Sequence, residues 1–535
     1  MALMLLPVLE AGLVRVPPRE EVPVPDDADT VMDAARAAEG WDVDAEGAVA
    51  GWASGARLLR GCVVDGSPLR VALEYSHRDD ALSNPSAVRV LSLSRPWRTG
   101  GWRVVEGGSG QEAADSDACG VTAVVLREGR ARHVRAVARA SWRAYSLHAR
   151  GADTLRPGAR DGVDDYGGMA VTAADSLDTL WLLGLRDEFD EACAIVNATP
   201  VATDAMVSVF ETSIRVLGGL LSAHALSGRG WLLDRAAELG KRLLPAFLDG
   251  ARLDGAPLPR SDVRPSTGQT SNPPWGSRSL SKLSLTLEMR HLSSSTGDPS
   301  FAFAADAAEA ALEREEARRE GALLPAFVRI GEGGKLRFSG PVTLGARVDS
   351  YYEYLLKEWV RSGGGASPSG GRARSFAAAA WRARERLLSN VTSGRVAGLP
   401  RRAFVGERDE AGKWVGKMDH LACFWPGALA LAVREGALPS HPHLSDAEAV
   451  LRTCLDMHST PSRLAPEITR LDGEGKLVVW PRDAHNLLRP ETLESLYVVW
   501  SVTGDDSLRD RAWEVFDAME RAARVMSTPG EEGGG

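Results

Sequence analysis

The 535-residue sequence has little of what marks several common protein classes. It contains 5 cysteines, and no two of them stand at the CxxC spacing of a zinc ribbon or a thioredoxin-like redox site. No apolar run reaches the length of about 18 residues that a membrane-spanning helix needs. Basic residues (63) are fewer than acidic residues (72), and there is no long basic run, which argues against a nucleic-acid-binding protein.

The residues that are present indicate a folded globular protein. Hydrophobic residues make up 44% of the chain and charged residues 25%, and the 15 tryptophans argue for packed cores. The apolar start, MALMLLPVL, lacks a basic flank and meets Glu10 too early for a signal peptide. The N-x-[ST] triplets at Asn197 and Asn390 are compatible with N-glycosylation, although such triplets also arise by chance.

The chain is expected to have three regions. Residues 1–130 are rich in Gly, Pro and Asp and contain β-like runs such as LRVALEY, which predicts an undefined N-terminal extension with one small sheet at most. Residues 131–526 show helical periodicity, and the low-complexity stretch 527–535 is expected to be disordered. About twelve helices are predicted, at 133–150, 170–197, 209–228, 231–248, 279–296, 301–319, 349–362, 372–389, 418–436, 445–458, 490–503 and 506–526. Six αα-hairpins without a strict repeat fit either an irregular α-solenoid or a closed α/α toroid.

One of these stretches, VFETSIRVLGGLLSAHALSG, shows the helical pattern clearly. Apolar side chains recur at i, i+4, i+7 and i+11 from Phe210 to Leu221, and Gly228 follows where a C-terminal cap is expected. Glu211 and Arg215 lie four residues apart beside this stripe, and the simplest interpretation is an ordinary ion pair.

Further carboxylates stand at the predicted starts of other helices. Asp349, in TLGARVDSYYEYLLKEWV, fits a helix N-cap together with the following serine. Glu491 follows a proline at a helix start, where an acid suits the helix dipole, and Glu494 lies on the same face. Other polar candidates near helix starts or in loops are Arg347, His420, Glu467 and Arg489. Because the sequence has no HExxH motif, nucleophile elbow or Walker loop, acid–base chemistry by carboxylates is the predicted reaction type.

Seven segments, taken in order, resemble the class I α-1,2-mannosidases of glycoside hydrolase family 47. They are VTAADSLDTLWLLGLRDEFDEA, VFETSIRVLGGLLSAHALSG, SLTLEMRHLSSSTGDPSF, TLGARVDSYYEYLLKEWV, KMDHLACFWPGALAL, RLAPEI and HNLLRPETLESLYVVWSVTGD. The resemblance covers residues 131–525. It implies an all-α fold, an (αα)7 barrel, and an inverting hydrolase that removes terminal α-1,2-linked mannose from high-mannose N-glycans.

The resemblance also implies a role for each candidate residue. Glu211 matches the family's catalytic acid, and Asp349 is also proposed for that role. Glu491 matches the base, and Glu467 matches another acidic residue of the cavity. The residues that match polar groups lining the sugar pocket are Arg215, Arg347, His420, Arg489 and Glu494. Inversion needs two carboxyl groups about 6.5–9.5 Å apart, one to protonate the leaving oxygen and one to activate water.

Three further properties come with the resemblance. The first is a disulfide between Cys423 and Cys454, for which chain entropy predicts a stabilisation of about 3–4 kcal/mol. The second is a bound calcium ion. The third is a place in the endoplasmic reticulum or Golgi, usually behind a membrane anchor. The expected partners are high-mannose N-glycans and no nucleic acid, with the protein a monomer.

The sequence departs from the family pattern at three points. The match stops near Val525, so the last helical hairpin and the threonine that ligates calcium are expected to be missing, and no metal-binding residue is assigned. Lys282 stands where an acidic residue is usual, and Thr154 stands where the family has a Glu. These departures leave a second interpretation, a catalytically impaired glycan-binding quality-control factor on the same fold. A third interpretation, a plain helical scaffold, is disfavoured by the retained carboxylates.

Overall fold

The computed structural model describes six short strands between residues 42 and 109, and then residues 119–319, 323–363, 371–390 and 401–524. The chain divides into two compact units, residues 15–141 and a larger unit that holds residues 142–535. The expected boundary at residue 131 falls inside helix α3 (Cys119–His148), which begins earlier than its sequence pattern indicates. The tail expected at 527–535 lies outside the described residues. The expectation that the last helical hairpin is missing is not tested by the described residues.

The smaller unit contains the small sheet that its β-like runs predict. Its four strands pair antiparallel in sequence order: β3 (Ala56–Gly66), β4 (Leu69–His77), β5 (Ala87–Ser94) and β6 (Arg103–Ser109). Two shorter strands, β1 (Asp42–Val43) and β2 (Val49–Ala50), pair separately.

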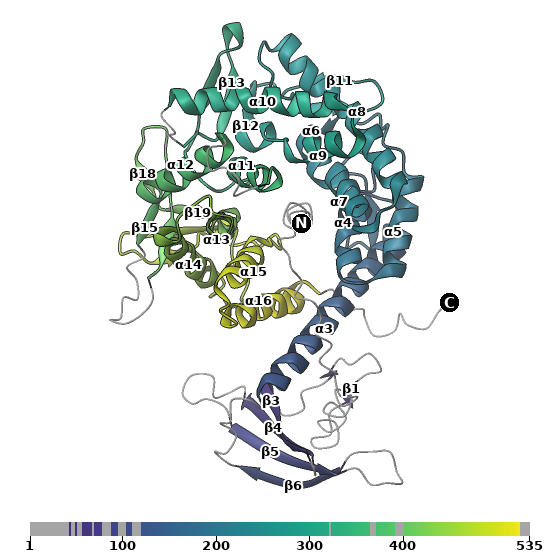
Figure 1. Cartoon of the computed structure of the whole chain (residues 1–535), viewed down its shortest axis with the longest axis vertical. Helices are drawn as coiled ribbons and strands as arrows, with labels where there is room; N and C mark the ends of the chain where they lie inside the picture. The colour runs from purple at the N-terminus through teal and green to yellow at the C-terminus, as the bar shows by residue number, and fades with distance from the viewer. Residues whose placement is uncertain are drawn as a thin grey trace. The chain divides into compact units, whose positions relative to one another are not determined.

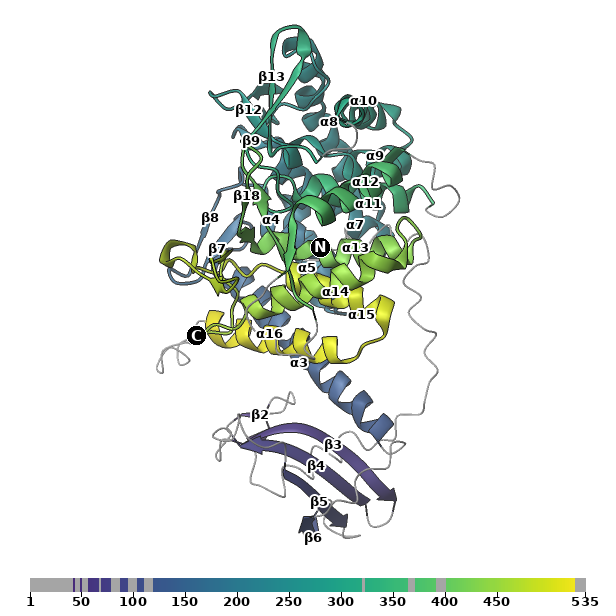
Figure 2. The same ribbon diagram turned by 90° about the vertical axis from the view of Figure 1, so that its left-hand side faces the viewer.

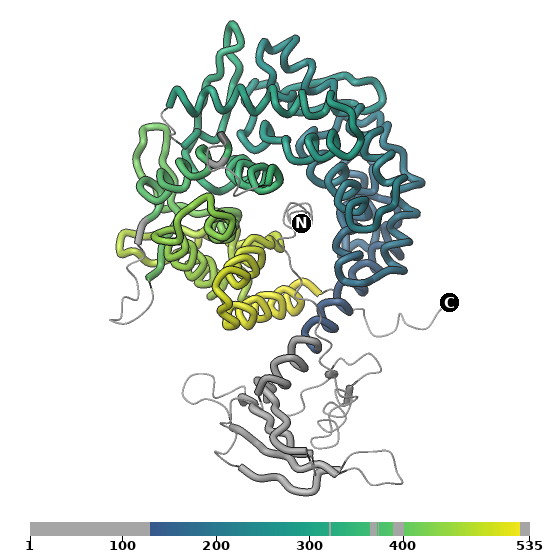
Figure 3. The backbone as a smooth tube through the Cα atoms, viewed as in Figure 1, coloured from purple at the N-terminus to yellow at the C-terminus, as the bar shows by residue number. Residues whose placement is uncertain are grey.

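The larger unit is a ring of helical hairpins (Figures 1 and 3). Its inner helices are α4 (Val171–Leu182), α7 (Gly218–Ser227), α9 (Leu287–Thr296), α11 (Asp349–Arg361), α13 (Trp425–Arg434) and α15 (Glu491–Thr503). Its outer helices are α5 (Arg186–Ala198), α8 (Gly230–Leu253), α10 (Pro299–Arg318), α12 (Gly371–Arg386), α14 (Ser440–Met457) and α16 (Ser507–Ala523). Each inner helix packs on the outer helix that follows it. Within the described residues, the predicted αα-hairpins are therefore confirmed, and they form an α/α toroid and not an irregular solenoid.

Inner and outer helices bury different surfaces. In the inner helix α11, ten consecutive residues from Tyr351 to Val360 are buried, as expected for a helix covered on all sides. In the outer helix α8, the buried positions include Leu232, Ala236 and Leu239, which form a single stripe. The sequence pattern therefore encodes the two layers of the ring.

Three predicted helices are divided in the structure. The stretch 170–197 is two helices, α4 and α5, separated at Gly184, whose φ of 72° is left-handed. The stretches 279–296 and 418–436 each begin with a strand and a 3-10 turn before the helix. These added elements are β12 (Ser277–Ser279), η2 (Leu280–Leu283), β19 (Lys417–Asp419) and η5 (His420–Phe424). Short apolar runs do not distinguish strand from helix by periodicity, which explains these errors.

The predicted helix 209–228 contains a π-helical turn. Helix α6 (Val209–Glu211) continues into the π-helix η1 (Thr212–Leu217), which leads into α7. A π turn shifts the helix face, so Ser213 is fully buried although it lies off the predicted apolar stripe. Gly228 caps the end of α7 with a φ of 70°, as predicted.

The loops that lead from an outer helix to the next inner helix carry short antiparallel strands. These loops follow α3, α5, α8, α10, α12 and α14, and several of their strands are seen at one side of the ring in Figure 2. They include β9 (Val207–Ser208), β10 (Asp262–Arg264), β13 (Phe327–Ile330), β14 (Leu336–Ser339) and β20 (Ile468–Leu471). The N-terminal ends of the inner helices therefore lie at the side of the ring where the chain is least regular.

Candidate active site

Four of the candidate residues from the sequence lie near the N-terminal ends of inner segments of the ring. Glu211 ends α6, Asp349 begins α11, His420 begins η5 and Glu491 begins α15. The elements that carry them pack in succession: α6 on η2, η2 on α11, α11 on η5, and η5 on α15. Side chains from distant parts of the sequence are thus gathered at one end of the ring.

Glu211 forms the ion pair that its spacing predicts. Its Oε2 lies 3.0 Å from Nε of Arg215, and Nη1 of Arg215 lies 3.3 Å from Oδ2 of Asp175 on α4. The guanidinium of Arg215 also lies 5.8 Å from the ring centre of Tyr166. The side chain of Glu211 is 31% exposed, so its carboxylate is held in place and remains accessible to a ligand.

Asp349 is held by hydroxyl and backbone donors. Its Oδ1 accepts hydrogen bonds from the Ser281 hydroxyl at 2.7 Å and from the Ser350 backbone N–H at 2.8 Å. The predicted N-cap role is wrong, because Asp349 is itself the first helical residue and Val348 occupies the cap position. Burial raises the pKa of Asp349 to about 6, although these hydrogen bonds oppose the shift.

Glu491 has an incompletely satisfied carboxyl group. Its Oε2 is buried and has no hydrogen-bond partner within the described part of the chain. Burial is the main cause that raises the pKa of Glu491 to about 8, and the charges of Glu494 and Asp349 act in the same direction. Arg489 opposes this shift.

The raised pKa of Glu491 predicts how stability depends on pH. The folded chain keeps this proton up to about pH 8, whereas an ordinary Glu loses it near 4.5. The folded state therefore binds more protons between these values, and the free energy of unfolding falls as the pH rises through that window. We expect the Tm, measured without calcium, to fall over this range and the fall to be smaller for Glu491→Gln. Glu474→Gln, at an exposed position, is the control, and equal slopes for wild type and Glu491→Gln would contradict the assignment.

Glu467 and Arg489 form a multidentate ion pair. Nε of Arg489 lies 2.9 and 2.8 Å from the two carboxylate oxygens of Glu467, and Nη2 donates to Oε1 as well. The backbone N–H of Glu467 donates to the carbonyl of His485 at 2.8 Å, and the carbonyl of Glu467 accepts from the N–H of His420 at 2.9 Å. The pair therefore connects the loop before α15 to η5.

His420 is a buried, neutral residue. Only 1% of it is exposed, and its Nε2 lies 2.9 Å from the hydroxyl oxygen of Thr492, the residue after Glu491. Burial lowers the pKa of His420 to about 3, with a further contribution from His458, whose ring lies 5.6 Å away. A histidine of this kind supports the wall of the pocket and does not supply protons near neutral pH.

Three remaining positions lie on the surrounding loops. Arg347 is exposed, has a left-handed φ of 82°, and accepts the Ser281 N–H at its carbonyl at 2.8 Å. Lys282 follows Ser281 on η2 and is half-buried. Thr154 donates a hydrogen bond to Asp165 at 2.8 Å. Lys282 thus brings a positive charge next to the serine that binds the Asp349 carboxylate.

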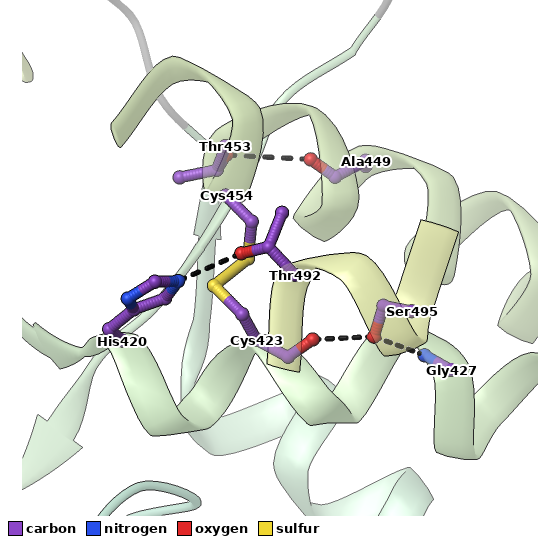
Figure 4. The surroundings of a disulfide bond; sticks show 8 residues. All are labelled: His420, Cys423, Gly427, Ala449, Thr453, Cys454, Thr492 and Ser495. Atoms are coloured by element: carbon purple, nitrogen blue, oxygen red, sulfur yellow. Dashed lines mark hydrogen bonds between the residues drawn. A yellow bond between two sulfur atoms is a disulfide. The ribbon is translucent and has the colours of Figure 1, made fainter. Parts of the chain in front are cut away.

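The predicted disulfide between Cys423 and Cys454 is present, with Cα atoms 5.9 Å apart (Figure 4). It joins η5 to α14. Ser495 of α15 donates to the carbonyl of Cys423 and accepts from the N–H of Gly427 at 2.9 Å. The disulfide therefore braces the first turns of α15, where Glu491 lies.

The site gathers several carboxyl groups but does not present a set of metal ligands. Burial is the main cause that raises the pKa of Glu491, Glu494 and Asp349, and the charges of Glu494 and Asp349 raise that of Glu491 further. One oxygen of Glu491 lacks a partner within the described residues. A cation would relieve this repulsion. However, no group of three or more His, Cys, Asp or Glu side chains in the described segments is arranged to hold a metal. The described side chains therefore do not by themselves form a calcium site.

Several hydroxyl groups that organise the site were not among the residues predicted from the sequence. Ser281 binds Asp349, Thr492 binds His420, and Ser495 binds the backbone of η5 and α13. Thr492 and Ser495 are almost fully buried on α15. Thr492 directly follows the candidate carboxylate Glu491, and Ser495 directly follows Glu494, in a largely apolar helix. This pattern was the signal in the sequence that could have indicated these two hydroxyl groups.

Comparisons with known proteins match this chain to one glycosidase family. The family model described as glycosyl hydrolase family 47 matches residues 137–532. The endoplasmic reticulum mannosyl-oligosaccharide 1,2-alpha-mannosidase of Homo sapiens is 38% identical over 396 residues, which cover 72% of this chain and 54% of the relative. A mannosyl-oligosaccharide 1,2-alpha-mannosidase of Arabidopsis thaliana is 33% identical over 440 residues, 72% of this chain and 68% of the relative.

A solved structure, the alpha-1,2-mannosidase from Trichoderma reesei, matches with a TM-score of 0.63 and 26% identity, over 74% of this chain and 85% of that chain. The (αα)7 barrel fold is thus confirmed as the fold type, and the described residues contain six inner–outer helix pairs of it. The chain spans about half the length of the human relative. Among the described helices, none has the length and apolar composition required to cross a bilayer. With the family model matching most of its length, the chain belongs to glycosyl hydrolase family 47.

Proposed function

We propose that the protein is an inverting glycoside hydrolase that removes terminal α-1,2-linked mannose from high-mannose N-glycans. The observation that carries the proposal is the gathering of Glu211, Asp349 and Glu491 at one end of the ring. Glycoside hydrolysis needs a pair of carboxyl groups in different protonation states. Burial and mutual repulsion of carboxylates are the means by which proteins separate such states.

Asp349 is suited to donate the proton to the leaving oxygen. Its pKa of about 6 leaves a useful protonated fraction near neutral pH, and Ser281 and Ser350 fix the orientation of its carboxyl group. Glu211 is paired with Arg215 and accessible, so it is placed to bind a sugar hydroxyl or a water that relays the proton.

Glu491 is the proposed base, which must accept a proton from the attacking water. With a pKa of about 8 it would already be protonated at neutral pH. Its use as a base therefore requires a positive charge or a hydrogen-bond donor close to Oε2 to lower that pKa. Arg489, held by Glu467, already lowers this pKa within the value of about 8, so the additional charge or donor must come from another group or from the bound substrate.

Calcium is included in the proposal as the cofactor. The carboxylates of Glu491 and Glu494 give the charge that favours a cation, and an ion bound there would polarise sugar hydroxyls and water. Because the described side chains do not form its coordination sphere, no catalytic step is assigned to it. The proposal further places the protein in the secretory pathway, in the endoplasmic reticulum or Golgi, as a monomer whose partners are N-glycans. The disulfide is consistent with an oxidising compartment.

The test is mannose release by the purified chain from a high-mannose N-glycan, in calcium and in a chelator. The matched control is the same glycan with its terminal α-1,2-linked mannoses already removed. We expect release from the first glycan alone, with β-mannose as the initial product in NMR spectra and higher rates in calcium. Glycan binding by a folded protein without release in either condition would overturn the proposal and favour the glycan-binding factor.

A further inference from the structure

A polar stripe runs along the inner helix α11, away from the pocket. Asp349, Glu353 and Lys357 follow at intervals of four residues, so they share one face of the helix. Glu353 and Lys357 are only 7% and 5% exposed. Buried charges are expensive unless they are well paired, and buried ion pairs often add little to stability. Stability alone therefore does not account for a lysine at this position.

Lys357 has carboxylate partners on two inner helices. It forms a hydrogen-bonded ion pair with Glu353 on its own helix, and its Nζ lies 3.9 Å from Oε1 of Glu494 on α15. In the ring, α13 lies between α11 and α15 and packs on both (Figure 1). The pair of Lys357 with Glu494 therefore joins two inner helices that both pack on α13.

The two helices that Lys357 joins carry opposite sides of the candidate active site. Asp349 is the first residue of α11, and Glu491 is the first residue of α15, one turn before Glu494. The negative charge of Glu353 acts on Asp349, and that of Glu494 acts on Glu491. The ammonium group of Lys357, in contact with both Glu353 and Glu494, offsets this repulsion from within the helices, while Arg489 offsets it from the residue two positions before Glu491.

We propose that Lys357 is a positioning residue of the active site, which fixes Glu494 and thereby the first turn of α15, with Glu491, relative to Asp349. The inference rests on the proposed function. Of the residues that match the sugar pocket, Lys357 contacts Glu494 but neither Arg215 nor Arg489 in the contacts above, so its loss should disturb the reacting geometry more than sugar binding. Misplacing reacting groups by about 1 Å can reduce a rate about 100-fold.

The experiment compares wild type, Lys357→Met, Glu494→Gln and the double variant K357M/E494Q. Mannose release gives kcat and KM, and thermal unfolding gives Tm. The matched control is Arg372→Met, which breaks a partly buried ion pair between two outer helices, where Nη2 of Arg372 lies 2.6 Å from Oε2 of Glu309. We expect K357M to lower kcat about 30- to 100-fold with KM within about threefold. The double variant should be no worse than the poorer single variant, and R372M should lower Tm alone.

The outcomes separate this inference from the proposed function. A fall in Tm with kcat unchanged in K357M would overturn the positioning role. If K357M does not fold, the kcat of E494Q is compared with the kcat of the double variant. A lower kcat in the double variant than in E494Q counts against the proposal. If wild type releases no mannose, the proposed function fails, and the Tm values then test the link between Lys357 and Glu494. Non-additive Tm shifts would support the link between Lys357 and Glu494, and additive shifts would refute it.

Discussion

Replacing Glu491 with glutamine should abolish measurable mannose release while the fold is kept. General acid–base catalysis contributes about 100- to 10,000-fold to a rate, and glutamine cannot accept the proton of the attacking water. The amide has nearly the same shape as the carboxyl group. It also removes a group whose pKa is raised by burial, so Tm near pH 7 should be unchanged or higher.

The measurement is kcat/KM for mannose release, together with Tm and circular dichroism for each variant. Asp349→Asn is expected to lose activity as well, because the proposed proton donor is removed. Glu474→Gln, on an exposed turn, is the matched carboxyl-to-amide control and should behave as wild type. Wild-type rates in Glu491→Gln would show that another group serves as the base.

Removing the disulfide should produce the largest loss of stability. The bond between Cys423 and Cys454 closes a loop of 31 residues, and the restriction it places on the entropy of the unfolded chain predicts a stabilisation of about 3–4 kcal/mol. We expect the double variant Cys423→Ser with Cys454→Ser to unfold at lower urea concentration by a corresponding amount. Activity should fall at moderate temperature, because Ser495 connects the backbone of Cys423 to the start of α15.

The control for that experiment is the buried free cysteine Cys193. Cys193→Ala changes a buried sulfur without breaking a covalent link, so it should shift the unfolding midpoint much less. Wild type treated with a reducing agent should match the double serine variant. Equal midpoints for oxidised and reduced wild type would contradict the predicted contribution of the bond.

Local patterns in the sequence were sufficient to predict the helical layers and one ion pair. The spacing of Glu211 and Arg215 fixes their contact within one helix, and the apolar stripes of the outer helices are visible in the sequence. The order of the seven segments identified the family and, with it, the disulfide. Such features depend on neighbours in the sequence or on a motif.

Contacts between segments that are far apart in the sequence could not be predicted from local patterns. Asp349 reads as a helix cap because its neighbours are all that a single sequence shows, whereas its main partner, Ser281, comes from another loop. No motif in the sequence marks Lys357, and only the folded ring places it against Glu494. The pKa of Glu491 likewise depends on burial by other helices.

The origin of each pocket residue in a different hairpin has a consequence for the order in which the molecule assembles. Every hairpin packs an inner helix on the outer helix that follows it, so its contacts are short in sequence and can form early. The pocket needs α6, α11, η5 and α15 together, and these are separated by long stretches of chain. Helices can therefore form well before the reacting groups meet, and a partly unfolded molecule can keep most of its helical content after its catalytic geometry is gone.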